Sequence, residues 1–211
     1  MTFRALFATA LVAGLAAPAH AELVFDFDTD AQGWTVQDGG AVAYRSSGGV
    51  TGGFLEFTDL DDRDMLAVWQ PGGADWSVYA AGVISFDARI LSPNPPNWSG
   101  FGEVSLSGPG GSVAVDVVPA DLPLADGSWQ HFSVPMAAFG SSLPGALAHV
   151  QALRIKTEYS ISTIGVPDSF EVLGLDNVVI SAVPEAPAWA LLLAGALLLP
   201  ALQRRRSPAP E

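Results

Sequence analysis

Three aspartates near the start of the chain alternate with other residues, in the stretch "DFDTD" that holds Asp26, Asp28 and Asp30. Alternate side chains of a β-strand point to the same face, so the three carboxylates gather if the strand continues through them. Crowded carboxylates repel one another unless a hard, oxygen-loving cation such as Ca²⁺ neutralises them. The run therefore predicts a structural Ca²⁺. The alternative left open is an acidic, solvated edge strand that discourages pairing with another chain.

A loop rich in proline and asparagine carries the second candidate site. The segment "SPNPPNWSGF" contains Asn94, Asn97 and Trp98 between two expected strands. Rigid loops often carry recognition, and an exposed indole can stack on a sugar ring while neighbouring amides bind its hydroxyl groups. We treat these three residues as a candidate ligand-binding site. The alternative is that Trp98 only caps the end of the domain.

Residue patterns typical of known catalytic centres are absent from the sequence. There is no cysteine, which excludes thiol catalysis and cysteine-based zinc sites. The signatures G-x-S-x-G and H-E-x-x-H and the glycine-rich phosphate loop are missing as well. His131 lies in an expected strand and His149 in a turn, and neither is expected to be catalytic. The sequence thus predicts no catalytic residues and a protein that is not an enzyme; a secreted carbohydrate-active enzyme with an unrecognised carboxylate pair is the alternative.

The sequence around these candidate residues has the pattern of β-strands. Apolar residues alternate through residues 22–182, and turn-forming residues interrupt them about every 8–12 positions, the rhythm of an all-β sandwich. In "ISFDARI", Ile84 and Phe86 face one way, while Asp87 and Arg89 face the other. We predict one antiparallel β-sandwich domain. Strands are expected at 23–28, 41–46, 54–58, 65–70, 82–90, 103–107, 112–118, 129–134, 152–159 and 170–181, and single helical turns at 135–140 and 144–149.

Five short motifs follow one another through this domain: "FDFDTDAQGW", "GGVTGGFLEFTDLDD", "DWSVYAAGVISFDARI", "DGSWQHFSVPM" and "LGLDNVVIS". Their order and spacing resemble the laminin B (domain IV) module and the wider galactose-binding-like jelly rolls. The resemblance implies a jelly-roll β-sandwich, a scaffold common in extracellular recognition. Related jelly rolls often hold a structural calcium where the first and last strands approach each other. The resemblance therefore implies Asp176 as a further calcium ligand beside Asp26, Asp28 and Asp30.

The first 21 residues have the pattern of a secretory signal peptide. Arg4 precedes an apolar stretch from Ala5 to Ala17, and Ala19-His20-Ala21 is a cleavage-type tripeptide. The apolar run is too short for a first transmembrane helix. We expect the general secretion machinery to export the chain and residues 1–21 to be removed.

The segment 183–211 combines an apolar run with a basic end. Residues 188–203 are expected to form a C-terminal transmembrane helix, although its apolar core spans roughly 22 Å against the ~30 Å of a bilayer core. The three arginines that follow, Arg204, Arg205 and Arg206, would remain in the cytoplasm. The segment is thus a marginal membrane span with a defined orientation.

A short motif at 183–189 precedes this helix, and its characteristic residues are Val183, Pro184, Glu185, Pro187 and Trp189. Motif, helix and arginine cluster together resemble the PEP-CTERM sorting signal of Gram-negative bacteria, although Ala186 stands before the second proline. The resemblance implies processing by an exosortase, a membrane cysteine protease/transpeptidase. It also implies transient anchoring in the inner membrane, then a place on the cell surface or in the extracellular matrix. The alternative is a permanently anchored scaffold.

The charge of the exported part limits the classes of molecule that are expected to bind it. Residues 22–183 contain 20 Asp and Glu against five Lys and Arg, within a chain of net charge −13. Such a field repels nucleic acid and anionic lipid, so neither is an expected partner. The sequence predicts a non-enzymatic surface or matrix protein of a biofilm, with a role in structure or adhesion. Its expected partners are the exosortase and exopolysaccharide or other glycans.

Overall fold

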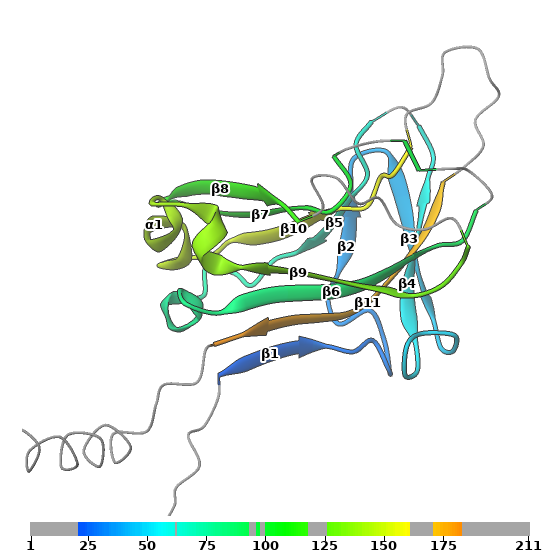
Figure 1. Ribbon diagram of the computed structural model, residues 1–211, viewed down its shortest axis with the longest axis horizontal. Coiled ribbons are helices and arrows are strands. Elements are labelled where there is room, and N and C mark those ends of the chain that lie inside the picture. Colours follow the sequence, from blue (N-terminus) through cyan, green and yellow to red (C-terminus); the bar gives the residue numbers. More distant parts are fainter. Residues whose placement is uncertain are drawn as a thin grey trace, which may run out of the picture. The chain divides into compact units, whose positions relative to one another are not determined.

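Two antiparallel β-sheets packed face to face make up the part of the chain that the computed structural model describes, residues 21–61, 63–92, 96–97, 100–117, 126–160 and 171–182 (Figure 1). The larger sheet contains β1 (Glu22–Phe25), β3 (Gly40–Arg45), β4 (Phe54–Asp59), β6 (Val83–Ile90), β9 (Gln130–Pro135) and β11 (Val172–Ser181). The smaller sheet contains β2 (Thr35–Gln37), β5 (Leu66–Trp69), β7 (Glu103–Gly108), β8 (Gly111–Asp116) and β10 (Ala152–Lys156). Three short helices are η1 (Ser77–Tyr79), η2 (Met136–Phe139) and α1 (Leu143–Leu147).

The strand order is that of a sandwich with crossovers between its sheets. The larger sheet runs β3-β4-β11-β6-β9, with β1 also paired to β11, and the smaller runs β2-β5-β10-β7-β8. The last strand, β11, therefore lies in the middle of its sheet, between strands that precede it by many residues. The predicted all-β antiparallel sandwich is confirmed.

Alternating burial along the strands builds the core between the two sheets. In β6, Ile84, Phe86, Ala88 and Ile90 are buried, while the residues between them are only partly buried. Large side chains from both sheets join them, among them Leu55, Phe57, Phe101, Leu106, Ile155 and Leu173. Full burial of each such apolar side chain stabilises the fold by about 1.5–3 kcal/mol. The side chains that alternate with these form the outer face of each sheet.

The strand β11 changes partner halfway along its length. Its first half pairs with β4 from Val172 to Leu175, and its second half pairs with β1 from Val178 to Ser181. Its register against β6 shifts between Asp176 and Val179, and Asn177 has a positive φ of 46°. Asparagine tolerates this left-handed conformation better than most residues. The irregularity places Asp176 where β1, β4 and β11 meet.

The observed strands differ from the predicted ones at three places. The strand predicted at 23–28 ends at Phe25, because Phe27 takes a positive φ of 49° and turns the chain. The strand predicted at 152–159 ends at Lys156. The sequence did not predict β2, which has three residues and only one apolar side chain. The predicted helical turns at 135–140 and 144–149 correspond to η2 and α1.

Residues 1–20 and 183–211, which make up nearly all of the two terminal segments, fall outside the described residues. The predicted signal peptide at 1–21 and the sorting signal at 183–211, with Val183 to Trp189 and Arg204 to Arg206, therefore stay predictions. Within the described ranges, no helix is long and apolar enough to cross a membrane.

Candidate ligand-binding site

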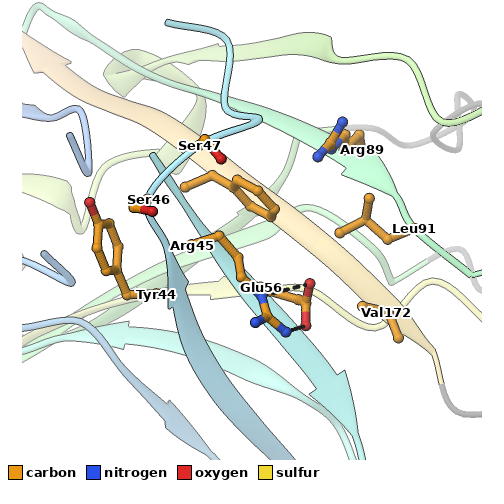
Figure 2. Close-up of a pocket in the computed structure, with 9 residues that line it drawn as sticks. Tyr44, Arg45, Ser46, Ser47, Glu56, Arg89, Leu91 and Val172 are labelled. Atoms are coloured by element: carbon orange, nitrogen blue, oxygen red, sulfur yellow. Dashed lines mark hydrogen bonds and ion pairs between the residues drawn. The ribbon is translucent and has the colours of Figure 1, made fainter. Parts of the chain in front are cut away.

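A hollow of about 720 Å³ opens on the outer face of the larger sheet (Figure 2). We call it the outer-face pocket. Its lining residues come from β3, β4, β6 and β11 and from the segments after β3 and β6, and they are Tyr44, Arg45, Ser46, Ser47, Phe54, Glu56, Arg89, Leu91 and Val172. The lining therefore mixes aromatic rings, hydroxyl groups and charged groups of both signs.

Strand pairing explains why these residues meet. Arg45 of β3 stands opposite Phe54 of β4, and Gly174 of β11 stands opposite both Glu56 and Arg89. Paired residues of antiparallel strands lie on the same face of a sheet. Four strands that are distant in sequence thus align their outward-facing side chains in one row.

At the centre of this row a cation lies against a pair of aromatic rings. The guanidinium carbon of Arg89 lies 4.9 Å from the ring centroid of Phe54 and 4.7 Å from that of Trp129. The two rings are themselves in edge contact, with centroids 5.6 Å apart. A cation over an aromatic face is attracted by about 0.5–2 kcal/mol, more when it is shielded from water. We call Phe54, Arg89 and Trp129 the Arg89 stack.

Gly174 makes room for the Arg89 stack. A Cβ atom added at this glycine would lie 3.0 Å from Trp129 Cη2, 3.2 Å from Arg89 Cγ and 3.3 Å from Phe54 Cδ2. These distances are at or below ordinary van der Waals contact, so a side chain here would displace the rings. The glycine is buried in the centre of the sheet because the Arg89 stack covers it.

Arg45 and Glu56 form the polar wall of the pocket, as Figure 2 shows. Arg45 donates from Nε to Glu56 Oε2 at 3.1 Å, and a second bond joins its Nη2 to Oε1. The hydrogen bond and the charge of Glu56 raise the pKa of Arg45. The side chain of Arg45 is 51% exposed and that of Glu56 20% exposed. Both groups therefore remain accessible at the mouth of the pocket.

The segment from Ser46 to Gly53 forms the rim and is fixed by contacts with the sheet. Trp129 donates from Nε1 to the carbonyl oxygen of Gly48 at 3.1 Å, so one indole both flanks Arg89 and holds the rim. Asp176 Oδ2 accepts from the backbone N–H of Val50 at 2.7 Å. These bonds order the rim before any ligand arrives, which lowers the entropic cost of binding.

The predicted triad of Asp26, Asp28 and Asp30 does not lie on a β-strand. The strand ends before these residues, and two of them serve a local turn: Asp26 Oδ1 accepts from Gln32 Nε2 at 3.0 Å, and Asp30 Oδ1 accepts from the Gln32 backbone N–H at 2.7 Å. The described residues contain no group of three acidic or histidine side chains placed to hold a metal ion. The shared face was expected only if the strand continued through the three aspartates, and β1 ends at Phe25. The calcium site itself stays a prediction.

Asp28 and Asp176 nevertheless approach the same glycine-rich rim. A Cβ atom added at Gly52 would lie 1.9 Å from Asp28 Oδ1, and one at Gly49 would lie 2.6 Å from Asp176 Oδ2. Asp176 is fully buried and accepts hydrogen bonds from the backbone N–H groups of Val50 and Asn177. Burial raises the pKa of Asp176, and the charges of Asp87 and Asp28 raise it further. Two of the four predicted calcium ligands thus lie at one place.

The predicted loop site is only partly covered by the described residues. Asn94 and Trp98 lie outside them. Asn97 is exposed, and its backbone N–H donates to the carbonyl oxygen of Tyr159 at 2.8 Å. Asn97 does not belong to the lining of the outer-face pocket. The site of Asn94, Asn97 and Trp98 therefore stays a prediction separate from this pocket.

A second group of carboxyls lies at the end of β10. Glu158 is hydrogen-bonded to Asp64, and burial, followed by this bond and the charges of Asp64, Glu171 and Asp59, raises the pKa of Glu158 to about 8. A hydrogen bond from Lys156 lowers the pKa of Asp64. Opposite shifts of this kind occur in acid–base pairs. Glycosidase carboxyls, however, stand about 5–9.5 Å apart to admit substrate, and a direct hydrogen bond leaves no such space.

Comparisons with known proteins concern the fold. No family model matches the chain, and no curated protein matches its sequence. The family 11 carbohydrate-binding module of a cellulosomal cellulase of Clostridium thermocellum is similar in structure, with a TM-score of 0.49, 16% identity, 80% of this chain and 99% of that chain covered. A xylan-binding domain of family 22 has a TM-score of 0.42 and 11% identity over 81% of this chain and 97% of its own. The L4b domain of human laminin alpha-2 has a TM-score of 0.45 and 10% identity over 61% of this chain and 80% of its own. No ligand follows from likenesses at this level.

Sequence reasoning placed Arg89 on an outward face but did not identify it as a site residue. Phe54 and Trp129 were missed as well. One signal could have been used: Phe54 and Glu56 share a face of their strand by alternation, which places an aromatic and a charged side chain on the same side of the sheet. The pairing of that strand with β11 could not be read from the sequence.

Proposed function

We propose that this chain is an exported, non-enzymatic glycan-binding protein and that the outer-face pocket is its binding site. The observation that carries the proposal is that Phe54 and Arg89 of the Arg89 stack line an open hollow, while Trp129 packs against both of them. Sugar recognition needs an apolar ring for the faces of the pyranose and oriented polar groups for its hydroxyls. Binding sites typically combine such aromatic walls with a few placed polar groups.

The polar groups around the Arg89 stack suit hydroxyl recognition. Ser46 and Ser47 supply hydroxyl groups at the rim, and the Arg45–Glu56 pair presents charged donors and acceptors. Bonds to charged partners are stronger than those between neutral groups. The pocket is shallow and open along the sheet, which favours a segment of a polymer over a small enclosed ligand.

Replacing Trp129 by alanine tests this assignment. The variant removes one ring of the Arg89 stack and the hydrogen bond to Gly48 that holds the rim. Buried or partly buried tryptophans at binding sites often contribute 2 kcal/mol or more, so we expect an affinity loss of about 30-fold. Isothermal titration against a panel of neutral and acidic polysaccharides measures it.

A matched control is Val78→Ala, which changes an exposed apolar side chain of η1 outside the pocket. It should bind as the wild type does. Unchanged affinity of Trp129→Ala for a polysaccharide that the wild type binds would place the site elsewhere. The absence of binding to every polysaccharide of the panel would contradict the proposed function itself.

A structural calcium ion at the rim is a second part of the proposal. Asp28 and Asp176 both reach the rim glycines, and Asp176 is a fully buried carboxylate that accepts hydrogen bonds from the backbone N–H groups of Val50 and Asn177. A divalent cation would offset the repulsion between these carboxylates, and Ca²⁺ accepts carboxylate and carbonyl oxygens together. Asp26 and Asp30 are held by Gln32 and are not part of this revised ligand set.

Chelation of calcium provides the test. A ligand that binds only the folded state stabilises it, so EDTA should lower the melting temperature and added CaCl₂ should restore it. If the free Ca²⁺ concentration is 100 times the dissociation constant, removal of the ion lowers the free energy of unfolding by about 2.7 kcal/mol. The variant Asp176→Asn should abolish the response. An EDTA-treated sample that melts at the untreated temperature would remove calcium from the account.

The sorting part of the proposal rests on the terminal segments. Residues 183–211 would direct exosortase processing after a transient stay in the inner membrane, and the released domain would act in an exopolysaccharide matrix. The motif at 183–189 and the arginines 204–206 support this part of the proposal through their order in the sequence.

A further inference from the structure

Basic side chains are rare in this acidic protein, and two of them line one pocket. Residues 22–183 contain five Lys and Arg, of which Arg45 and Arg89 line the outer-face pocket. Four of the five have polar partners. These are Glu56 for Arg45, Asp61 for Arg63, Gln37 and Ser107 for Arg154, and Asp64 for Lys156.

Arg89 differs from the other four. Within the described part of the chain its guanidinium makes no hydrogen bond and no ion pair, and its Nε is buried without a partner. A partly buried charge without a partner is costly, because it loses hydration without replacement. The two rings of the Arg89 stack offset only part of this cost, through the attraction of a cation to an aromatic face.

The carboxylates closest to Arg89 in the sheet are engaged by other groups. Glu56 and Arg89 stand on opposite sides of Gly174 in the sheet, on β4 and β6. The carboxylate of Glu56 accepts hydrogen bonds from Arg45. Asp87, two residues before Arg89 on β6, pairs through Oδ1 with His131 Nδ1 at 2.9 Å, and its Oδ2 accepts from Asn177 Nδ2 at 2.8 Å. Both acids are thus paired with other groups, and Arg89 lines the pocket without either of them as a partner.

We propose that the outer-face pocket selects a glycan residue that carries a carboxylate, a uronic acid unit, and that Arg89 binds this carboxylate. The inference rests on the proposed glycan-binding function and names the ligand class of the same site. A planar guanidinium matches a carboxylate with two parallel hydrogen bonds, which a hydroxyl group cannot form. Contacts with the rings of Phe54 and Trp129 restrict the guanidinium, so less freedom is lost when the carboxylate arrives.

The overall charge of the chain affects which length of acidic glycan can bind. At net charge −13 the protein repels a dense polyanion at long range, but at physiological ionic strength charges beyond about 8 Å are largely screened. The attraction to Arg89 is local and survives this screening. Short uronate oligomers are therefore better ligands than long, fully charged chains, and oligogalacturonate is a suitable probe.

The experiment compares oligogalacturonate with the same oligomer after methyl esterification, which removes the charge and keeps the sugar ring. We expect the wild type to bind the acid about 10-fold more tightly than the ester, as hydrogen bonds to a charged group imply. Arg89→Gln should bind both equally. Arg89→Lys should keep only part of the preference, because an ammonium lacks the planar fork. Arg154→Gln, which removes a cation from the opposite sheet, should behave as the wild type does.

The outcomes separate this inference from the function on which it rests. Equal wild-type affinity for acid and ester, or an acid preference that persists in Arg89→Gln, would overturn the uronate assignment while glycan binding stands. Failure of acid, ester and neutral oligosaccharides alike to bind would overturn both. Thermal melting of each variant shows whether it is folded; if Arg89→Gln is not, the comparison of acid and ester on the wild type decides.

Discussion

Replacing Gly174 by valine should weaken binding at the outer-face pocket by about 30-fold or more, while the sandwich stays folded. A single added carbon already meets Trp129, Arg89 and Phe54 at 3.0–3.3 Å, and valine adds two methyl groups beyond it. The Arg89 stack must then separate. Such an effect on the site is comparable to deletion of a tryptophan at a binding hot spot.

Two opposing terms keep the stability cost of this variant moderate. Overpacking typically costs about 1–3 kcal/mol. Valine, however, favours extended backbone over glycine by up to about 1 kcal/mol in strand interiors. Ala114→Val, on an exposed position of β8 in the other sheet, is the matched control and should change neither binding nor melting. Full affinity in a folded Gly174→Val protein would mean that the Arg89 stack is not part of the site.

The folded protein should be most stable near pH 5 and lose stability as the pH rises to 8. Burial, the bond to Asp64 and nearby acids raise the pKa of Glu158 to about 8, and burial raises the pKa of Glu171 to about 7, against a reference value of 4.5 for both. Between pH 4.5 and these raised pKa values, the two carboxyl groups keep their protons in the folded state but have released them in the unfolded state. Stability therefore falls with rising pH across this interval.

The size of this effect is limited by solvent. Glu171 is buried, but Glu158 is partly exposed, so screening reduces its share. We expect the melting temperature at pH 8 to be roughly 5 °C or more below that at pH 5, since about 1 kcal/mol corresponds to 2–4 °C for a domain of this size.

Replacing Glu158 by a neutral residue tests whether its charge causes the loss of stability at high pH. Glu158→Gln keeps a donor for Asp64 and removes the charge, so it should raise the melting temperature at pH 8 and leave it almost unchanged at pH 5. Glu103→Gln, at an exposed position of β7, is the control and should be neutral at both. A melting temperature that rises or stays level from pH 5 to pH 8 would show that Glu158 and Glu171 are ionised in the folded state.

Alternation of apolar residues made the fold predictable from sequence. Of the eleven strands in the described part of the chain, ten were expected close to where they lie, because each buries one face and exposes the other. The clearest case is β6, with Ile84 and Phe86 inward and Asp87 and Arg89 outward. The pattern failed where conformation depends on single backbone angles. The strand ends at Phe25, just before the positive φ of Phe27, so Asp26, Asp28 and Asp30 do not lie on one strand.

The site was not predictable in the same way, because it depends on which strands become neighbours. Phe54 and Arg89 are 35 positions apart, and Gly174 lies 85 positions beyond Arg89. Only the central position of β11 brings the three into one row. Local pattern gives the face on which a side chain lies, whereas cross-strand register, set by the whole sheet, gives its neighbours.

The most direct test of the account is a crystal structure of the protein with bound oligogalacturonate. We predict a sugar ring in the outer-face pocket, beside Trp129 and above the row of Glu56, Gly174 and Arg89, with its carboxylate within hydrogen-bonding distance of the Arg89 guanidinium. A sugar bound on the outer face of the smaller sheet, or at the loop that contains Asn97, would contradict the assignment of the site.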